Sequence, residues 1–158
     1  MKIGFGYDIH PLQEGRNLIL GGQKINYKKG LAGHSDADVL IHAVMDALLG
    51  AAGLGDLGMH FPDTNPRLEN ISSMIMLSHV VTLLKKVKYK ISNIDATVVL
   101  ENPKIADYYP KMKKNLSSIL KISESNINIK ATTNEKMGPV GREEGIAAFC
   151  VVLIEKIV

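Results

Sequence analysis

Hydrophobic positions along the 158-residue chain follow two different periods, and the period predicts the type of each element. Alternating or short, largely apolar stretches predict strands over 1–10, 17–20, 24–27, 91–100, 127–133 and 145–157. Helical spacing of apolar residues predicts helices over 37–49, 70–88 and 108–121. This order of elements predicts an α/β domain of the two-layer α+β type, with helices packed on one face of a mixed sheet of four to five strands.

The first predicted strand carries unusual backbone residues. Gly4 and Gly6 lie two apart, and we expect the strand to approach another part of the chain closely at these positions. Pro11 lacks an N–H group and is expected to end regular pairing. The next two short strands flank Gly21-Gly22, which predicts a hairpin.

The predicted helix over 37–49 is apolar on nearly all sides, which is typical of a helix buried on several sides. Ser35 or Asp36 is expected to cap its start, and the glycine-rich stretch 50–55 ends it. Two longer polar stretches, 56–66 and 134–142, are predicted to be loops, and loops of this kind often carry function.

Composition narrows the class of protein. Hydrophobic residues make up 46% and charged residues 22%, and a length of 158 residues predicts one domain, 1–158. The net charge of +3 is modest, and we expect no nucleic-acid partner. No apolar run reaches the roughly 18 residues that span a bilayer, so we expect no membrane partner. The single cysteine, Cys150, lies in an apolar run and is expected in the core. We expect a cytoplasmic protein, or one of a plastid or apicoplast stroma if a transit peptide has been removed.

Ionisable residues interrupt these apolar elements. Asp8 and His10 lie two apart, so they leave the same face of the first strand, and His42 lies on the first helix. One oxygen and two nitrogen ligands with an open fourth position are typical of a catalytic zinc site. From the spacing alone, a capping Asp8 and a hydrogen-bonded core His42 remain the alternative. Asp38, His42 and Asp46 recur every four residues and form one stripe of the helix.

A second polar group follows the strand over 127–133. Thr132, Thr133 and Glu135 offer hydroxyls and a carboxylate, which suit a phosphate–magnesium unit, and the alternative is a turn stabilised by Thr and Asn side chains. The chain has no phosphate-binding loop of the Walker type, which excludes that class of nucleotide hydrolase. A Ser35–His34 nucleophile–base pair is disfavoured because adjacent side chains rarely face one another.

Several short motifs together resemble the 2-C-methyl-D-erythritol 2,4-cyclodiphosphate synthase family of the non-mevalonate route to isoprenoids. These motifs are Gly6-Tyr7-Asp8-Ile9-His10, His34-Ser35-Asp36-Ala37-Asp38-Val39 with His42, Gly55-Asp56-Leu57-Gly58, Phe61-Pro62-Asp63-Thr64, Pro103-Lys104, Ala131-Thr132-Thr133 with Glu135-Lys136, and Gly141-Arg142-Glu143-Glu144-Gly145. The resemblance covers essentially the whole chain, with the motifs in order.

The resemblance implies a metal-dependent phosphorus–oxygen lyase. The substrate would be 4-diphosphocytidyl-2-C-methyl-D-erythritol 2-phosphate, cyclised with release of CMP. It implies that Asp8, His10 and His42 bind Zn²⁺ and that Glu135 binds a second divalent cation, Mg²⁺ or Mn²⁺. It also implies a homotrimer, with the sheets facing the trimer axis and active sites between adjacent subunits.

The resemblance also assigns roles within the site. His34 and Thr133 would be catalytic, His34 and Ser35 would cover the methylerythritol phosphate, and residues 100–106 would form the cytidine pocket. The implied substrate contacts are Asp8, His10, His34, Ser35, Asp56, Leu57, Gly58, Phe61, Pro62, Asp63, Thr64, Asn65, Leu100, Pro103, Lys104, Ile105, Ala106, Thr132, Thr133, Asn134, Glu135 and Arg142.

A few positions depart from the family pattern or lack an assigned role. Asn65 stands where an aspartate is common, Asn134 where a third threonine is frequent, and Pro139 where some members have an aromatic residue near the trimer axis. Asp46 is expected to orient His42, with a purely structural role as the alternative. Two other functions remain open: a small metal-dependent phosphohydrolase or nucleotidyl-type enzyme, and a non-catalytic trimeric binding module.

Overall fold

The centre of the molecule is a five-stranded mixed sheet with the strand order β4-β1-β7-β5-β6. The structure is a computed structural model that describes residues 1–62 and 64–157. The strands are β1 (Lys2–Glu14), β4 (Lys29–Leu31), β7 (Gly145–Lys156), β5 (Tyr89–Val99) and β6 (Ile127–Thr132), and a separate hairpin is formed by β2 (Leu18–Leu20) and β3 (Gln23–Ile25). β5 and β6 are parallel, and the other neighbours in the sheet are antiparallel.

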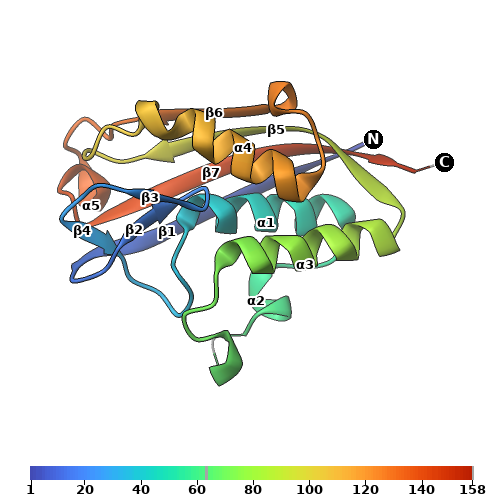
Figure 1. The fold of residues 1–158 in the computed structure, drawn as a ribbon, viewed down its shortest axis with the longest axis horizontal. Coiled ribbons are helices and arrows are strands. Elements are labelled where there is room, and N and C mark those ends of the chain that lie inside the picture. Colours follow the sequence, from blue (N-terminus) through green and yellow to red (C-terminus); the bar gives the residue numbers. More distant parts are fainter. Residues whose placement is uncertain (63, 158) are drawn as a thin grey trace.

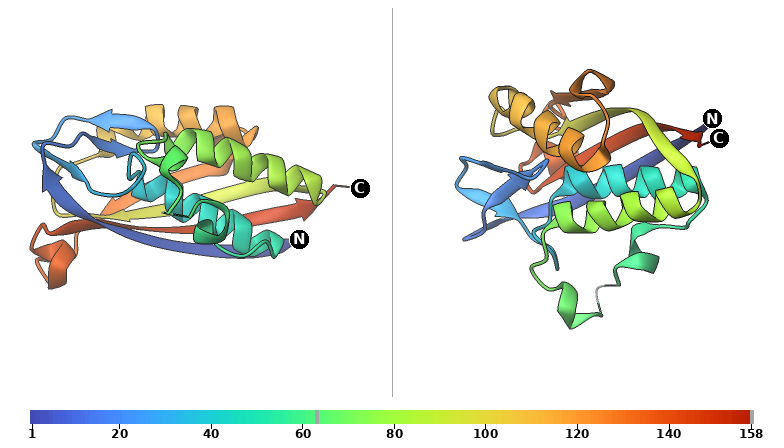
Figure 2. Two further views of the ribbon diagram at one scale, coloured as in Figure 1. Left: turned by 90° about the horizontal axis from the view of Figure 1, so that it is seen from below. Right: turned by 45° about the vertical axis from the view of Figure 1, so that its right-hand side comes forward.

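Three long helices cover one face of this sheet, as Figures 1 and 2 show. They are α1 (Val39–Ala52), α3 (Ser73–Lys86) and α4 (Tyr109–Leu120). The shorter helices are α2 (Leu57–His60), α5 (Gly138–Gly141), η1 (Pro66–Leu68), η2 (Ala106–Tyr108) and η3 (Glu124–Asn126). The predicted two-layer architecture is confirmed. The stretches 56–66 and 134–142, predicted as loops, contain the short helices α2 and α5, which the prediction missed.

Two glycines allow α1 to lie directly on β1. A Cβ atom built on Gly4 would lie 1.9 Å from the carbonyl oxygen of Ala47, and one on Gly6 would lie 2.0 Å from that of Ala43. No side chain fits at such distances, so glycine is required for this close approach. The predicted approach is confirmed. Because strand side chains alternate, the same face of β1 carries the side chains of residues 8 and 10 toward α1.

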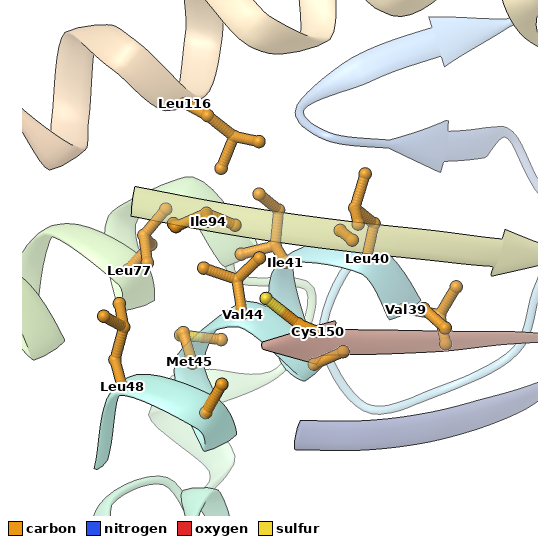
Figure 3. Packing of buried hydrophobic residues seen from close by; sticks show 14 of the residues in the cluster. Val39, Leu40, Ile41, Val44, Met45, Leu48, Leu77, Ile94, Leu116 and Cys150 are labelled. Carbon is orange, nitrogen blue, oxygen red and sulfur yellow. The ribbon is translucent and has the colours of Figure 1, made fainter. Parts of the chain in front are cut away.

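The core lies between the sheet and the three helices. Figure 3 shows Ile41 and Val44 of α1 close to Ile94 of β5, Leu77 of α3 and Leu116 of α4. All five side chains are fully buried. The prediction that the first helix is buried on several sides is confirmed, since it packs against β1 and β7 of the sheet and against α3.

The start of α1 differs from the prediction. The helix begins at Val39, and its N-cap is Asp38 rather than Ser35 or Asp36. The Asp38 carboxylate accepts a hydrogen bond from Ile41 N–H and two more from the backbone N–H groups of the β2–β3 turn. Asp38 is therefore a buried cap between helix and hairpin, which the pattern of helical spacing could not reveal.

Pro11 does not end the pairing of β1. It lies opposite Gly145 of β7, and β1 continues to Glu14 alongside β4, a strand the prediction missed. The missing N–H group of Pro11 is not needed here, because neighbouring groups make the hydrogen bonds. Leu12 N–H donates to Glu144, and the carbonyl of Pro11 accepts from Ala32 N–H.

The other face of the sheet, here called the open face, exposes an apolar patch on β1 and β7. Its large side chains are 37–73% exposed and are Ile3, Phe5, Tyr7, Ile9, Phe149 and Val151. The ring of Phe149 lies 4.9 Å from that of Tyr7 and 6.2 Å from that of Phe5. A contiguous apolar patch of this kind marks an interaction surface. None of the helices in the described part of the chain is long and apolar enough to cross a membrane.

Candidate metal centre and substrate cavities

Asp8, His10 and His42 converge on one point between β1 and α1. His10 Nε2 lies 2.9 Å from Asp8 Oδ2, His42 Nδ1 lies 3.0 Å from the same oxygen, and the two nitrogens are 3.0 Å apart. Two imidazole nitrogens at this distance need a proton or a cation between their lone pairs. The structure thus brings the three predicted ligands together, as Gly4 and Gly6 allow, and Asp8 is not a helix cap.

The donor set fits a zinc ion. One carboxylate oxygen and two imidazole nitrogens, one atom from each residue, lie within 4.8 Å of one another. Ligands of a tetrahedral ion bound at about 2.0–2.1 Å lie roughly 3.3 Å apart, close to the spacing in this group. Burial raises the pKa of Asp8, but the hydrogen bonds and charges of His10 and His42 outweigh it and lower that pKa to about 2. Asp8 is therefore a carboxylate anion at neutral pH and can donate an electron pair to a metal ion.

The second nitrogen of His42 is held by two hydroxyls. Its Nε2 lies 3.0 Å from Ser73 Oγ and 3.2 Å from Ser35 Oγ, and Ser73 Oγ in turn donates to the carboxylate of Asp36. Asp46 does not take the predicted orienting role. Its carboxylate instead accepts a hydrogen bond of 2.8 Å from Leu57 N–H and so joins α1 to α2. Ser73, the second of two adjacent serines and the first residue of α3, was not predicted.

A cavity of about 430 Å³ opens beside these three ligands. Its lining residues are Asp8, His10, Gly33, His34, Ser35, His42, Leu57, Gly58, Phe61, Leu68, Ile71 and Met76. Seven of the predicted substrate contacts or ligands besides His42 lie in this wall: Asp8, His10, His34, Ser35, Leu57, Gly58 and Phe61. Leu68, Ile71 and Met76 were not predicted, because apolar residues at the start of a helix look like ordinary core.

The polar stretch after α2 contacts one of the residues that line this cavity, His34. His34 Nε2 lies 3.2 Å from the carbonyl oxygen of Asn65, and the ring of Phe61 packs edge-on against His79 with centroids 5.7 Å apart. Pro62 and Thr64 are exposed to solvent. Asp63 lies outside the described residues, so its predicted substrate contact stays a prediction.

A second cavity, of about 250 Å³, lies where β5 and β6 end. The structure brings seven predicted contacts together in it: Leu100, Pro103, Lys104, Ile105, Ala106, Thr132 and Thr133. Glu101, which lies within the predicted pocket range 100–106, lines it as well, together with Tyr109 and Ala131, which were not predicted. Parallel pairing of β5 and β6 explains the grouping, because it places the carboxyl ends of both strands at one edge of the sheet.

Carboxylates accept hydrogen bonds from the turn after β6 and hold this turn beside the second cavity. Thr133 Oγ1 donates to Glu135 Oε1 at 3.0 Å, and Glu101 Oε1 accepts from Asn134 N–H at 2.8 Å and from Lys136 N–H at 3.2 Å. The exposed carboxylate of Glu135 therefore stands beside the hydroxyl of Thr133, and this geometry fits the predicted phosphate–metal unit as well as the alternative of a turn stabilised by side chains.

Two predicted substrate contacts, Asp56 and Arg142, bond to residues close to them in the sequence. Asp56 caps α2 by accepting from Met59 N–H at 2.9 Å, and Arg142 Nε donates to Glu144 Oε1 at 2.6 Å. The Asp56 cap contact and the exposed Arg142–Glu144 pair are compatible with substrate binding but do not line either cavity as described. Their substrate roles stay predictions.

The two cavities have no lining residue in common. The metal-side cavity lies beside β1, whereas the second one lies at the ends of β5 and β6, and β7 separates these strands in the sheet. A single chain thus carries two candidate half-sites, one beside the candidate metal ligands and one with hydroxyls, a lysine and backbone groups.

Comparisons relate the chain to known proteins. The model of the YgbB family matches residues 1–155. A protein of Chloroherpeton thalassium named 2-C-methyl-D-erythritol 2,4-cyclodiphosphate synthase is 57% identical over 157 residues, covering 99% of this chain and 100% of that protein. A protein of the same name from Syntrophobacter fumaroxidans is 52% identical over 154 residues, covering 98% of this chain and 97% of that protein.

Solved structures share the fold. The bifunctional IspDF of Campylobacter jejuni has a TM-score of 0.95 at 40% identity, and the match covers 99% of this chain and 42% of that longer one. A 2C-methyl-D-erythritol-2,4-cyclodiphosphate synthase in its CDP-bound form has a TM-score of 0.89 at 34% identity, covering 98% of this chain and 100% of that one. A CDP complex from Plasmodium falciparum has a TM-score of 0.87 at 37% identity, covering 99% and 97%.

Proposed function

The chain belongs to the YgbB family, and we propose that it catalyses the reaction after which its curated relatives are named. It converts 4-diphosphocytidyl-2-C-methyl-D-erythritol 2-phosphate to 2-C-methyl-D-erythritol 2,4-cyclodiphosphate in the non-mevalonate isoprenoid pathway. The observation that carries this proposal is the convergence of Asp8, His10 and His42, with donor atoms 2.9–3.0 Å apart, in the wall of a cavity.

The reaction is an internal phosphoryl transfer. An oxygen of the 2-phosphate forms a bond to the β-phosphorus, the bond from that phosphorus to the bridging oxygen breaks, and CMP leaves with the bond electrons. The nucleophile is already an anionic phosphate, so no activated serine or cysteine is needed. Catalysis then depends on positioning and on neutralising charge, which is the usual contribution of protein in phosphoryl transfer.

The chain's own residues fit this task. His34 and Ser35, in the wall of the metal-side cavity, are proposed to hold the methylerythritol phosphate. Thr133 is proposed to donate a hydrogen bond to the diphosphate, because its hydroxyl already faces a carboxylate oxygen at 3.0 Å. Lys104 and the backbone of residues 100–106 are proposed to hold the cytidine and its phosphate. The CDP-bound forms of two similar structures support a nucleotide as the ligand.

We propose Zn²⁺ at Asp8, His10 and His42, because nitrogen-rich ligation suits zinc better than magnesium. A bound zinc ion would supply Lewis-acid chemistry and a template for the phosphate groups. A second divalent cation, Mg²⁺ or Mn²⁺, is proposed at Glu135, whose exposed carboxylate suits a hard cation shared with phosphate oxygens. These assignments make the chain a metal-dependent phosphorus–oxygen lyase.

A homotrimer is the proposed assembly. The open face carries exposed aromatic and branched side chains of β1 and β7, which favours its burial against other copies of this chain. The separation of the two half-sites supports the same assembly. The metal-side cavity of one subunit and the nucleotide cavity of the next would then form one active site.

The single cysteine is a buried thiol, which suits a reducing compartment such as the cytosol.

Phosphorus NMR on the reaction mixture tests the proposed activity. The purified protein, with zinc and magnesium ions, is incubated with the cytidyl substrate. Equal amounts of cyclic diphosphate and CMP are expected. Inorganic phosphate as the product would instead indicate a phosphohydrolase, and an unchanged substrate with a zinc-loaded protein would indicate a binding module. Either result would contradict the proposal.

A further inference from the structure

We propose that Asp36 and Ser73 act together as positioning residues that fix which nitrogen of His42 faces the metal. The inference deepens the proposed function, since it rests on His42 being a metal ligand. It concerns residues on two different elements: Asp36 lies before α1, and Ser73 is the first residue of α3.

The hydroxyl of Ser73 has a single proton, and it donates this proton in a hydrogen bond to Asp36. Ser73 Oγ donates to Asp36 Oδ1, while Asp36 Oδ2 accepts from Ser73 N–H at 3.0 Å. A carboxylate is an acceptor only, so the direction of the first bond is fixed. Ser73 Oγ can therefore only accept from its other neighbour, His42 Nε2, at 3.0 Å.

This direction sets the tautomer of His42. Nε2 must carry the proton, so in the neutral ring the lone pair lies on Nδ1. That nitrogen is the one that lies 3.0 Å from both Asp8 Oδ2 and His10 Nε2. Hydrogen bonding of the outer nitrogen is the usual way in which proteins fix a metal-bound histidine and raise its basicity.

Ser35 does not set this preference alone. Its Oγ lies 3.2 Å from His42 Nε2 and accepts from Ala37 N–H at 3.1 Å. The proton of Ser35 is not directed to a carboxylate, so this hydroxyl can donate to Nε2 or accept from it. The Asp36–Ser73 pair removes that ambiguity.

The pair is held on a rigid part of the molecule. Ser73 is completely buried and His42 is 8% exposed. The backbone beside Asp36 is joined to the start of α3, because Asp36 N–H donates to Ile71 and Asn70 N–H donates to His34. Rigid support of this kind is what holds a ligand in a productive geometry.

A purely structural role for Ser73 at the start of α3 is the rival explanation. The chain offers a matched control, because Ser72 is the N-cap of this helix and its Oγ accepts from Met74 N–H at 3.3 Å. Ser72→Ala removes the cap and leaves His42 untouched. Ser73→Ala removes the acceptor for Nε2–H, and Asp36→Ala frees the Ser73 proton to donate to Nε2.

The first measurement is the tautomer of His42 in the full-length protein after zinc removal, by long-range ¹H–¹⁵N NMR at a pH where the ring is neutral. The wild-type protein is expected to be protonated at Nε2, and Asp36→Ala is expected to populate the form protonated at Nδ1. A wild-type ring protonated at Nδ1 overturns the proposal. Because this measurement needs neither metal nor a variant, it separates failure of this inference from failure of the proposed metal site.

The second measurement is zinc affinity, by competition with a chelator. Ser73→Ala is expected to bind zinc about 10–100-fold more weakly than the wild type. Ser72→Ala is expected to lose thermal stability while keeping its zinc affinity. Equal zinc affinity in Ser73→Ala and the wild type, or equal losses in the two serine variants, contradicts the proposal.

Discussion

Asp38 and Gly22 are joined by a hydrogen bond of 2.7 Å, in which the backbone N–H of the β2–β3 turn donates to the carboxylate that caps α1. The same carboxylate accepts from Gly21 N–H at 3.0 Å and from Ile41 N–H at 3.1 Å. One buried side chain thus fixes both the start of the helix that carries His42 and the position of the hairpin.

Asp38→Asn tests this contact. An asparagine offers one acceptor oxygen in place of two and turns an amide N–H₂ group toward a backbone donor. We expect the free energy of unfolding to fall by about 1–3 kcal/mol, measured by urea denaturation. Asp107→Asn, at an exposed position, is the control and should leave stability unchanged. An equal stability in both variants would show that Asp38 is not a cap of consequence.

Gly6→Ala tests the close approach of α1 to β1. The new Cβ would lie 2.0 Å from the carbonyl oxygen of Ala43, so α1 must move away from the strand that carries the metal ligands. We expect a loss of about 3 kcal/mol or more in unfolding free energy, together with weaker zinc binding. Gly50→Ala is the contrasting variant. Gly50 lies in α1, and no atom lies within 4 Å of a Cβ built there, so this substitution should stabilise the protein by about 0.5–1 kcal/mol.

Cys150 should be unreactive in the native protein. Its side chain is 1% exposed, and burial, with a further contribution from the charge of Asp95, raises the pKa of the thiol from 9.0 to about 12. At a pH near 9, about 0.1% of the thiol would be thiolate, the form that reacts. Mass spectrometry after iodoacetamide treatment should find no label until denaturant is added. Rapid labelling of the folded protein would contradict the core position of Cys150, which the sequence predicted and the structure confirms.

His42→Ala and Glu135→Gln should separate the two proposed metal sites. His42→Ala removes one of three ligand atoms that lie 2.9–3.0 Å apart, so zinc retained after purification should be lost. Glu135→Gln removes a carboxylate at the other cavity, so turnover should fall much more than zinc content. Elemental analysis and a product assay on both variants give the comparison. Full zinc occupancy in His42→Ala, or equal zinc loss in Glu135→Gln, would refute the assignments.

The sequence was sufficient for the layers of the fold and for the grouping of Asp8, His10 and His42. Alternation put Asp8 and His10 on one strand face, Gly4 and Gly6 indicated the close approach, and the helical period made His42 part of a buried helix. These are local patterns, and each one fixes the direction of its side chains.

The sequence was not sufficient for the contacts that orient those ligands. Spacing of four residues suggested that Asp46 supports His42, yet Asp46 binds the backbone of α2 and Ser73 takes this place. Ser73 is 31 residues away from His42 along the chain, and a serine at the start of a helix is ordinarily a cap. The N-cap of α1 was missed for the same reason. The carboxylate of Asp38 is held in place by hydrogen bonds from backbone N–H groups of a hairpin that lies far from it along the chain.

The proposed active site joins the metal-side cavity of one subunit to the nucleotide cavity of another, so that both act on one substrate. It is tested by mixing His42→Ala with Thr133→Ala, two variants expected to be inactive alone, under conditions that exchange subunits, and then measuring formation of the cyclic diphosphate. Random exchange at equal amounts pairs two intact halves in about a quarter of the sites of a cyclic oligomer, so about a quarter of wild-type activity should return. A mixture that stays inactive, while native mass spectrometry detects mixed oligomers, would show that the two cavities do not act on one substrate.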